Sequence, residues 1–210
     1  LGESQKNPLT MPIPLGIIPT VGPYFIPLVL PSIRKKFPEL KLKIIEAQSS
    51  TLTDKVNNGE IDMAILAMPY KLDGLLSFKF WEEDFYYISH KENLGSEIIK
   101  IKAKEIDLSN LMLLDDGHCL KSHVLAACKM DADKQYSMEA SSLSTLTQLV
   151  AGNMGSTLVP HMAIKQLVSS NSLIKKAHLD EPGPHRELAI VIRPSYTGFK
   201  NVQLLIDIFS

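Results

Sequence analysis

The sequence predicts an α/β fold made of two lobes with a cleft between them. Short apolar segments alternate with segments of helical composition in two separate stretches of the chain. An order of strand, helix, strand, helix, strand implies a parallel sheet with right-handed crossovers. A chain of 210 residues that is 45% hydrophobic can bury one large core or two small ones. Two such stretches therefore indicate two α/β lobes.

The first stretch contains three expected strands and two expected helices. The strands are expected at residues 15–19, 41–47 and 61–67, and the helices at residues 27–37 and 51–58. Pro38 closes the first helix, and Gly59 stops the second. Residues 77–90 follow as an extended aromatic segment, which we interpret as part of the core rather than as a platform for stacking bases.

The second stretch repeats the alternation. Strands are expected at residues 111–114, 156–159 and 188–193, and helices at residues 120–130, 142–151, 161–168 and 200–209. Ser141 or Ser142 is the expected N-cap of the second of these helices. We expect lobe I to comprise residues 15–82 with 195–210, and lobe II to comprise residues 83–194.

Composition excludes several classes of protein. The net charge of −1 and the pI near 6.7 argue against a nucleic-acid-binding surface, which needs clustered Lys and Arg. There is neither an apolar run long enough to span a membrane nor a signal segment at the start, so we expect a cytoplasmic protein without a membrane partner. Residues 1–14 read as a linker remnant, and Leu1 suggests a fragment of a longer chain.

Cys119 and Cys128, the only two cysteines, lie nine residues apart in a segment of helical composition. In a regular helix this spacing places them on opposite sides and about 13.5 Å apart along the axis, whereas a disulfide needs Cα atoms within about 7 Å. They can be joined only if the helix unwinds, which is how a switch behaves. Cys119 falls in the first turn, where a thiolate is stabilised, although on spacing and context alone an inert, small apolar role is favoured, as is usual for an unbonded cysteine. Cys128 follows apolar residues and is expected to be buried.

The rival chemistries have weaker support. His118, Cys119, His123 and Cys128 lie within eleven residues, but zinc sites need a second pair of ligands elsewhere, so we expect no metal and no cofactor. Residues 152–155 lack a Walker lysine, and the carboxylates are too scattered for a paired-acid hydrolase. A thiol peroxidase would need a thioredoxin-like pattern that the chain lacks. We therefore expect a sensor and not an enzyme.

The sequence resembles the regulatory domain of OxyR, the peroxide-sensing branch of the LysR-type transcriptional regulators. The most specific motif is GHCL at 117–120 followed by Cys128, and GEIDMAI at 59–65 is generic to the LysR type. Other matching segments are LGIIPTVGPY at 15–24, EAQ at 46–48, LML at 111–113, SL at 142–143, TL at 145–146, LVP at 158–160 and RP at 193–194.

The resemblance implies a periplasmic-binding-protein-like fold of type 2 and a role for each of six residues. Cys119 would be the peroxidatic cysteine, and Cys128 the resolving one. The residues implied to surround the peroxide or the thiolate are Thr20, Ser49, His118 and Arg186. Their chemistry agrees, since hydroxyls donate and accept and a guanidinium favours a thiolate. They also have ordinary alternatives as turn, cap or surface ion-pair residues.

The resemblance also implies partners. These are hydrogen peroxide, a second copy of the domain (a tetramer in the full regulator), and reductants of the thioredoxin or glutaredoxin type. DNA would be bound only through a winged helix-turn-helix that is absent from this fragment. Two departures stand out, because Ser49 replaces a common Thr, and Lys121 with Ser122 replaces a common Arg-Asp pair. The main alternative is an effector domain whose cleft binds a small metabolite and whose cysteines are incidental.

Overall fold

The chain forms two compact units. The computed structural model describes residues 12–130 and 138–209, so most of the expected lead-in at 1–14 lies outside the described residues. Unit 1 combines the residues up to Trp81 with those from Glu187 onward, and unit 2 is the continuous segment Glu82–Arg186. The borders of these units differ from those of the expected lobes, since Glu82 falls in unit 2 and residues 187–194 fall in unit 1. The reason is that this segment pairs with a strand of the unit 1 sheet.

Unit 1 contains a five-stranded sheet with the strand order β2-β1-β3-β11-β4. Its elements are β1 (Ile13–Ile17), α1 (Gly22–Lys36), β2 (Leu42–Glu46), α2 (Ser49–Asn57), β3 (Met63–Met68), β4 (Leu76–Glu83), β11 (Arg186–Ile192) and α6 (Phe199–Phe209). β1 runs parallel to both β2 and β3, as the expected strand and helix order requires. β11 returns antiparallel to β3.

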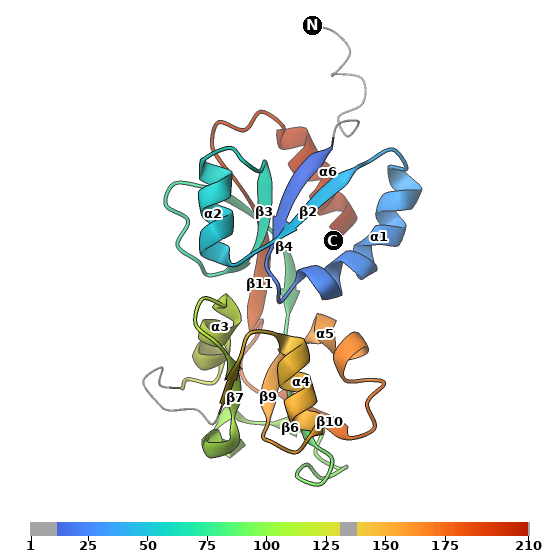
Figure 1. Ribbon diagram of the computed structural model, residues 1–210, viewed down its shortest axis with the longest axis vertical. Coiled ribbons are helices and arrows are strands. Elements are labelled where there is room, and N and C mark those ends of the chain that lie inside the picture. The colour runs from blue at the N-terminus through green and yellow to red at the C-terminus, as the bar shows by residue number, and fades with distance from the viewer. Residues whose placement is uncertain (1–11, 131–137, 210) are drawn as a thin grey trace, which may run out of the picture. The chain divides into compact units, whose positions relative to one another are not determined.

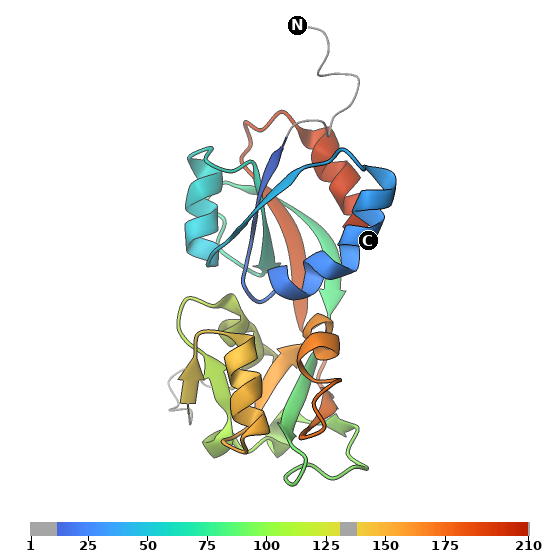
Figure 2. The ribbon, with the colours of Figure 1, turned by 45° about the vertical axis from the view of Figure 1, so that its right-hand side comes forward.

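Helices cover both faces of this sheet. α2 lies on one face and contacts β3, while α1 and α6 contact each other on the other side of the sheet (Figures 1 and 2). Phe25 of α1 packs against Phe80 of β4 and Phe209 of α6, with ring centroids 5.6 Å and 5.0 Å apart. The aromatic segment around β4 thus contributes to the core of unit 1.

α1 begins five residues before the expected start at residue 27, so Pro27 lies inside the helix together with Pro31. A proline removes one backbone donor, which usually ends or kinks a helix. Here Phe25, Val29 and Ile33 are buried at spacings of four residues. Burial of this apolar stripe outweighs the missing donors.

Unit 2 contains a four-stranded sheet of order β6-β10-β5-β9 and a two-stranded sheet of β7 and β8. Its elements are β5 (Phe85–His90), β6 (Lys100–Ile101), β7 (Met112–Leu114), α3 (Cys119–Ala127), β8 (Met138–Ala140), α4 (Leu143–Ala151), β9 (Thr157–Pro160), α5 (His161–Leu167) and β10 (Ile174–Leu179), with two short 3-10 turns, η1 (Ala103–Glu105) and η2 (Leu108–Asn110).

The four-stranded sheet of unit 2 is mostly antiparallel, so it is not a second copy of the parallel strand and helix arrangement of unit 1. β5 pairs antiparallel with both β9 and β10, and only the β10–β6 pair is parallel within that sheet. β7 and β8 run parallel to each other, and a bridge from Leu111 to Ser156 joins β7 to the start of β9. The sequence did not predict β6, β8 or β10, and β10 carries two lysines in place of an apolar run.

Candidate redox site

Cys119 is the first residue of α3. β7 ends at Leu114, and the turn that follows includes Gly117, whose φ of +94° is readily adopted only by glycine. His118 is the N-cap, and Cys119 is partly exposed. The first amides of a helix lack intrahelical partners and carry the positive end of the helix dipole, so they stabilise a nearby thiolate. The expected position of Cys119 in the first helical turn is confirmed.

Cys128 stands at the opposite end of α3 as its C-cap. The helix ends three residues earlier than expected, because Lys129 has a φ of +52° and leaves the helical conformation. Cys128 is 6% exposed, and burial raises the pKa of its thiol to about 12, with a smaller contribution from the Glu181 carboxylate. The expected burial of Cys128 is confirmed.

Neither Cys119 nor Cys128 forms a disulfide. Cys119 begins the helix and Cys128 follows its last residue, so they are separated by about 13.5 Å along the axis at the helical rise. A disulfide tolerates about 7 Å between Cα atoms. The structure therefore describes a state in which the two sulfurs cannot bond without loss of helix in α3.

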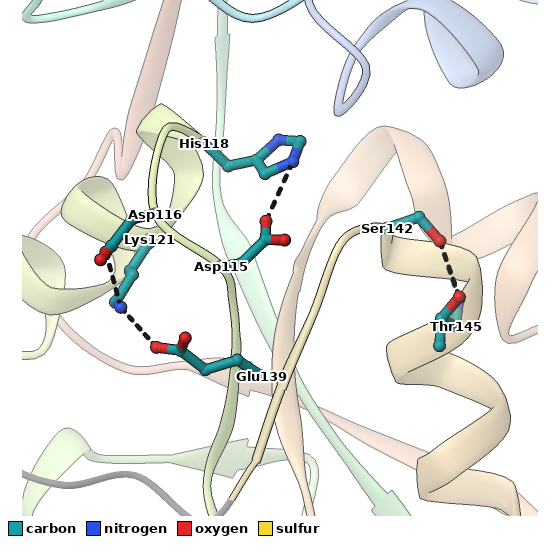
Figure 3. A network of polar contacts seen from close by, with 7 residues as sticks. All are labelled: Asp115, Asp116, His118, Lys121, Glu139, Ser142 and Thr145. Atoms are coloured by element: carbon teal, nitrogen blue, oxygen red, sulfur yellow. Dashed lines mark hydrogen bonds and ion pairs between the residues drawn. The ribbon is translucent and has the colours of Figure 1, made fainter.

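Lys121 fixes the first turn of α3 to its surroundings (Figure 3). Its ammonium donates to Asp116 of the preceding turn at 2.9 Å and to Glu139 of β8 at 2.5 Å. The hydrogen bond to Glu139, followed by that to Asp116, raises the pKa of Lys121. The departure from the common Arg-Asp pair thus leaves a cation at 121 that bridges two carboxylates, while Ser122 is exposed.

His118 faces Asp115 across the turn, with its Nε2 3.3 Å from a carboxylate oxygen of Asp115 (Figure 3). The side chain of His118 is only 8% exposed. His118 directly precedes Cys119 in the chain. The two groups form an ion pair when His118 is protonated, but this Asp115 oxygen accepts no hydrogen bond from the described residues.

Arg186 is buried rather than on the surface, since only 1% of the residue is exposed. Its Nε and one terminal nitrogen donate to the same oxygen of Glu83, at 3.0 Å and 2.5 Å. The other oxygen of Glu83 accepts from the backbone amide of Met162 at 3.0 Å. The structure thus gives Arg186 a carboxylate partner, and its effect on the Cys119 thiolate stays a prediction.

Thr20 and Ser49 belong to unit 1 and follow the ends of β1 and β2. Because these strands are parallel neighbours, both residues lie at the same edge of the sheet, where ligands of open α/β sheets bind. Both side chains are buried, and Ser49 is 2% exposed at the start of α2. Among the described residues, the Ser49 hydroxyl finds no hydrogen-bond partner. A buried polar group of this kind usually has a partner.

Two other features, a metal site and a membrane-spanning helix, can be checked against the structure. Within residues 12–130 and 138–209, no three His, Cys, Asp or Glu side chains are grouped so as to hold a metal ion. Over the same residues, no helix has both the length and the apolar character that crossing a bilayer requires.

Three contacts of this region were missed from the sequence. They are the Glu83 partner of Arg186, the Asp115 partner of His118, and the Glu139 partner of Lys121. The run of acids at 82–84 and the aspartate three residues before His118 were the available signals. Nothing local to Lys121 pointed to Glu139, which is 18 residues away.

The comparison with known families places the chain among the effector domains of transcriptional regulators. The chain belongs to the LysR family, since the family model described as the LysR substrate binding domain matches residues 7–210. This is a family of transcriptional regulators and not of enzymes, and its effector domain has a periplasmic-binding-protein-like fold.

The chain is similar to three proteins in particular. It is 35% identical to the HTH-type transcriptional regulator EstR of Acinetobacter baylyi, covering 99% of this chain and 69% of EstR. It is also 35% identical to a probable hydrogen peroxide-inducible genes activator of Streptomyces viridosporus, over 91% of this chain and 62% of that protein. The reduced regulatory domain of OxyR2 from Vibrio vulnificus matches with a TM-score of 0.85 and 30% identity, over 96% and 95% of the two chains. The chain thus spans about two thirds of the length of these regulators and nearly all of the solved domain, and the resemblance to OxyR regulatory domains is confirmed.

Proposed function

We propose that this chain is the peroxide-sensing regulatory domain of a LysR-type transcription factor, switched by a Cys119–Cys128 disulfide. The observation that carries the proposal is the arrangement of the two thiols at opposite ends of α3. One is partly exposed at the helix N-terminus, and the other is buried, with its thiol pKa raised by that burial. Similarity to a hydrogen peroxide-inducible activator and to OxyR2 supports the same reading.

The chemistry balances in two steps. The Cys119 thiolate attacks one oxygen of H2O2, the O–O bond breaks, and sulfenic acid and hydroxide form. Cys128 then attacks the sulfenic sulfur, and the oxygen leaves as water when the disulfide forms. The first step needs a thiolate, which the start of α3 favours. The second needs Cys128 to lose its burial and its helical separation, so α3 must unwind in between.

Four further residues have proposed supporting roles. His118 would neighbour the reacting sulfur, with an Asp115 carboxylate oxygen 3.3 Å from its Nε2. Arg186 would favour the thiolate, and its Glu83 partner reduces the net charge that it can offer. Thr20 and Ser49 would hydrogen-bond peroxide or a bridging water, and the buried Ser49 hydroxyl has capacity for such a bond. Thr20→Val and Ser49→Ala should each slow oxidation of Cys119 if these roles hold.

In the whole regulator, unwinding of α3 would change the surface between two copies of this domain. We propose a dimer of this domain and a tetramer of the full protein, acting in the cytoplasm. DNA would be bound by a helix-turn-helix segment such as the one in the name of EstR. Thioredoxin or glutaredoxin systems have potentials that can reduce a strained disulfide and so reset the sensor.

Mass spectrometry of the thiols tests the proposal. The reduced domain receives one molar equivalent of H2O2, free thiols are blocked, and the peptides are mapped. We expect the loss of two hydrogens and a Cys119–Cys128 crosslink. Cys128→Ser should stop at the sulfenic acid, which a dimedone reagent traps, and Cys119→Ser should not react. Two free thiols in the treated wild-type protein would overturn the proposal.

A second candidate is an effector domain gated by a small metabolite, with the cysteines incidental. The buried, unpartnered Ser49 hydroxyl at the strand ends of unit 1 favours it, and so does the similarity to EstR, whose name mentions no peroxide. It predicts saturable thermal stabilisation by a metabolite that survives Cys119→Ser, and no response to peroxide.

A further inference from the structure

α3 is a short helix with little local support. It contains nine residues, and isolated helices shorter than about 12–15 residues are marginal in water. Within the described part of the chain, the side chain of the N-cap residue His118 makes no hydrogen bond that caps the helix. α4 has the same length, but there the Ser142 hydroxyl accepts from the Thr145 amide at 3.1 Å. The stability of α3 therefore depends on its packing against the rest of unit 2.

The apolar face of α3 lies over a small cavity. Leu120 and Val124, one helical turn apart, line the cavity from α3, and residues of β7, α4 and β9 form its other walls. Apart from Lys121, every residue of the lining is at most 3% exposed. The cavity leaves about 10 Å³ for the centre of a water molecule, which is close to the least that a single water needs.

The polar side chains of the lining are already bonded. The Thr157 hydroxyl donates to the Met112 carbonyl at 2.7 Å, and the Lys121 ammonium donates to two carboxylates. A buried water needs about two to four polar partners, so this cavity is a gap in apolar packing rather than a site for a bound molecule. Atoms that face such a gap lose part of their dispersion contacts. α3 therefore gains less from its buried face than a fully packed helix would.

Val124 connects this gap to the second cysteine. Its side chain lines the gap, and its carbonyl accepts from the Cys128 amide at 3.0 Å at the end of the helix. Cys119, by contrast, is the first residue of α3 and is not part of the lining. A change at the gap should therefore act on the release of Cys128 and not on the Cys119 thiolate.

We propose that this gap keeps α3 close to opening, and that the opening sets how fast Cys128 reaches the oxidised Cys119. Opening means that α3 loses its helical hydrogen bonds while the rest of unit 2 stays folded, as in the local unfolding of other proteins. The first half of the proposal concerns the reduced domain alone. The second half rests on the proposed disulfide switch, in which the two thiols must come within bonding distance.

The first test is hydrogen–deuterium exchange of the reduced domain, followed by mass spectrometry of peptides from α3 and α4. Val124→Ile adds one methylene group at the wall of the gap, and Val124→Leu adds the same group in a different shape. Val150→Ile is the matched control, because it adds a methylene group to α4 at a buried position outside the lining.

We expect the amides of α3 to exchange faster than those of α4 in the wild type. At least one Val124 variant should slow exchange in α3 about fourfold, which is the effect of burying one methylene group, and Val150→Ile should not. Exchange in α3 as slow as that in α4, or Val124 variants that leave it unchanged, would refute the proposal. So would a Val150→Ile protein in which exchange in α3 slows equally.

The second test measures the switch itself. After one molar equivalent of H2O2, the Val124 variant that slows exchange should form the Cys119–Cys128 crosslink about fourfold more slowly than the wild type. In the Cys128→Ser background, the same variant should be labelled by dimedone at Cys119 as fast as its parent. An unchanged rate of crosslinking would show that opening does not limit the switch. A wild-type protein that forms no crosslink would instead contradict the proposed function, and exchange would still decide whether α3 opens easily.

Discussion

The buried ion pair between Glu83 and Arg186 offers a sharp test of how this fold is held together. Glu83→Gln keeps the size of the side chain and an oxygen that can accept from Met162, but it removes the carboxylate charge. The Arg186 guanidinium then loses the carboxylate that accepts two of its hydrogen bonds inside unit 2. Both side chains are almost completely buried, at 2% exposure or less, so water cannot take the place of the lost carboxylate.

The expected cost follows from that burial. Breaking a buried ion pair by removing one partner destabilises proteins by about 3–5 kcal/mol, because an uncompensated charge remains. We therefore expect Glu83→Gln to lower the free energy of unfolding by about that amount. Replacing both partners with neutral side chains, as in Glu83→Gln combined with Arg186→Met, should recover much of the loss, since both charges of the pair are then removed.

A second, more exposed ion pair between β4 and β11 provides the control. Lys79 of β4 and Glu187 of β11 form an ion pair with side chains that are 47% and 38% exposed. Glu187→Gln should cost at most about 1 kcal/mol, because water screens this pair. Urea unfolding followed by far-ultraviolet circular dichroism measures all four proteins. If Glu83→Gln cost no more than Glu187→Gln, the reasoning from burial would be refuted.

Three further predictions concern α3 and α4. Lys121→Met should lower the free energy of unfolding by about 1 kcal/mol or less and speed disulfide formation under peroxide, because the tie to Glu139 is lost; an unchanged rate of crosslinking would contradict this. Ser142→Ala removes the hydroxyl that caps α4 and should cost about 1 kcal/mol in urea unfolding, with Ser142→Asn restoring most of it. Cys128, with its pKa raised to about 12, should remain protonated and resist iodoacetamide at pH 8 in the native domain while Cys119 reacts. Its alkylation should accelerate only as the pH approaches 12 or in urea, and equal rates for the two thiols at pH 8 would argue against its burial.

Local patterns predicted the local features of the structure. The parallel set β1, β2 and β3 was expected from alternation alone, since burial and turn residues within a short window specify such segments. The position of Cys119 in the first turn of α3 and the Ser142 cap followed from residues directly beside them. These predictions needed no knowledge of distant parts of the chain.

Local sequence patterns did not predict the features that depend on residues far apart in the chain. Arg186 meets Glu83 across 103 residues of sequence, so its burial depends on a topology that spacing does not reveal. β10 was missed because its two lysines break the apolar pattern. The start of α1 was misplaced because the prolines suggested a boundary that the buried stripe of the helix overrides. In each case tertiary packing outweighs the local preference.

The interleaved connectivity has a consequence for the order in which the protein is made. Unit 2 is continuous from Glu82 to Arg186, whereas the unit 1 sheet places β11 between β3 and β4. A ribosome therefore releases every residue of unit 2 before the strand that completes unit 1 exists. Because domains generally fold as units during synthesis, the segment that contains both cysteines can fold early. Until β11 has been made, β4 lacks the strand that it pairs with in the sheet.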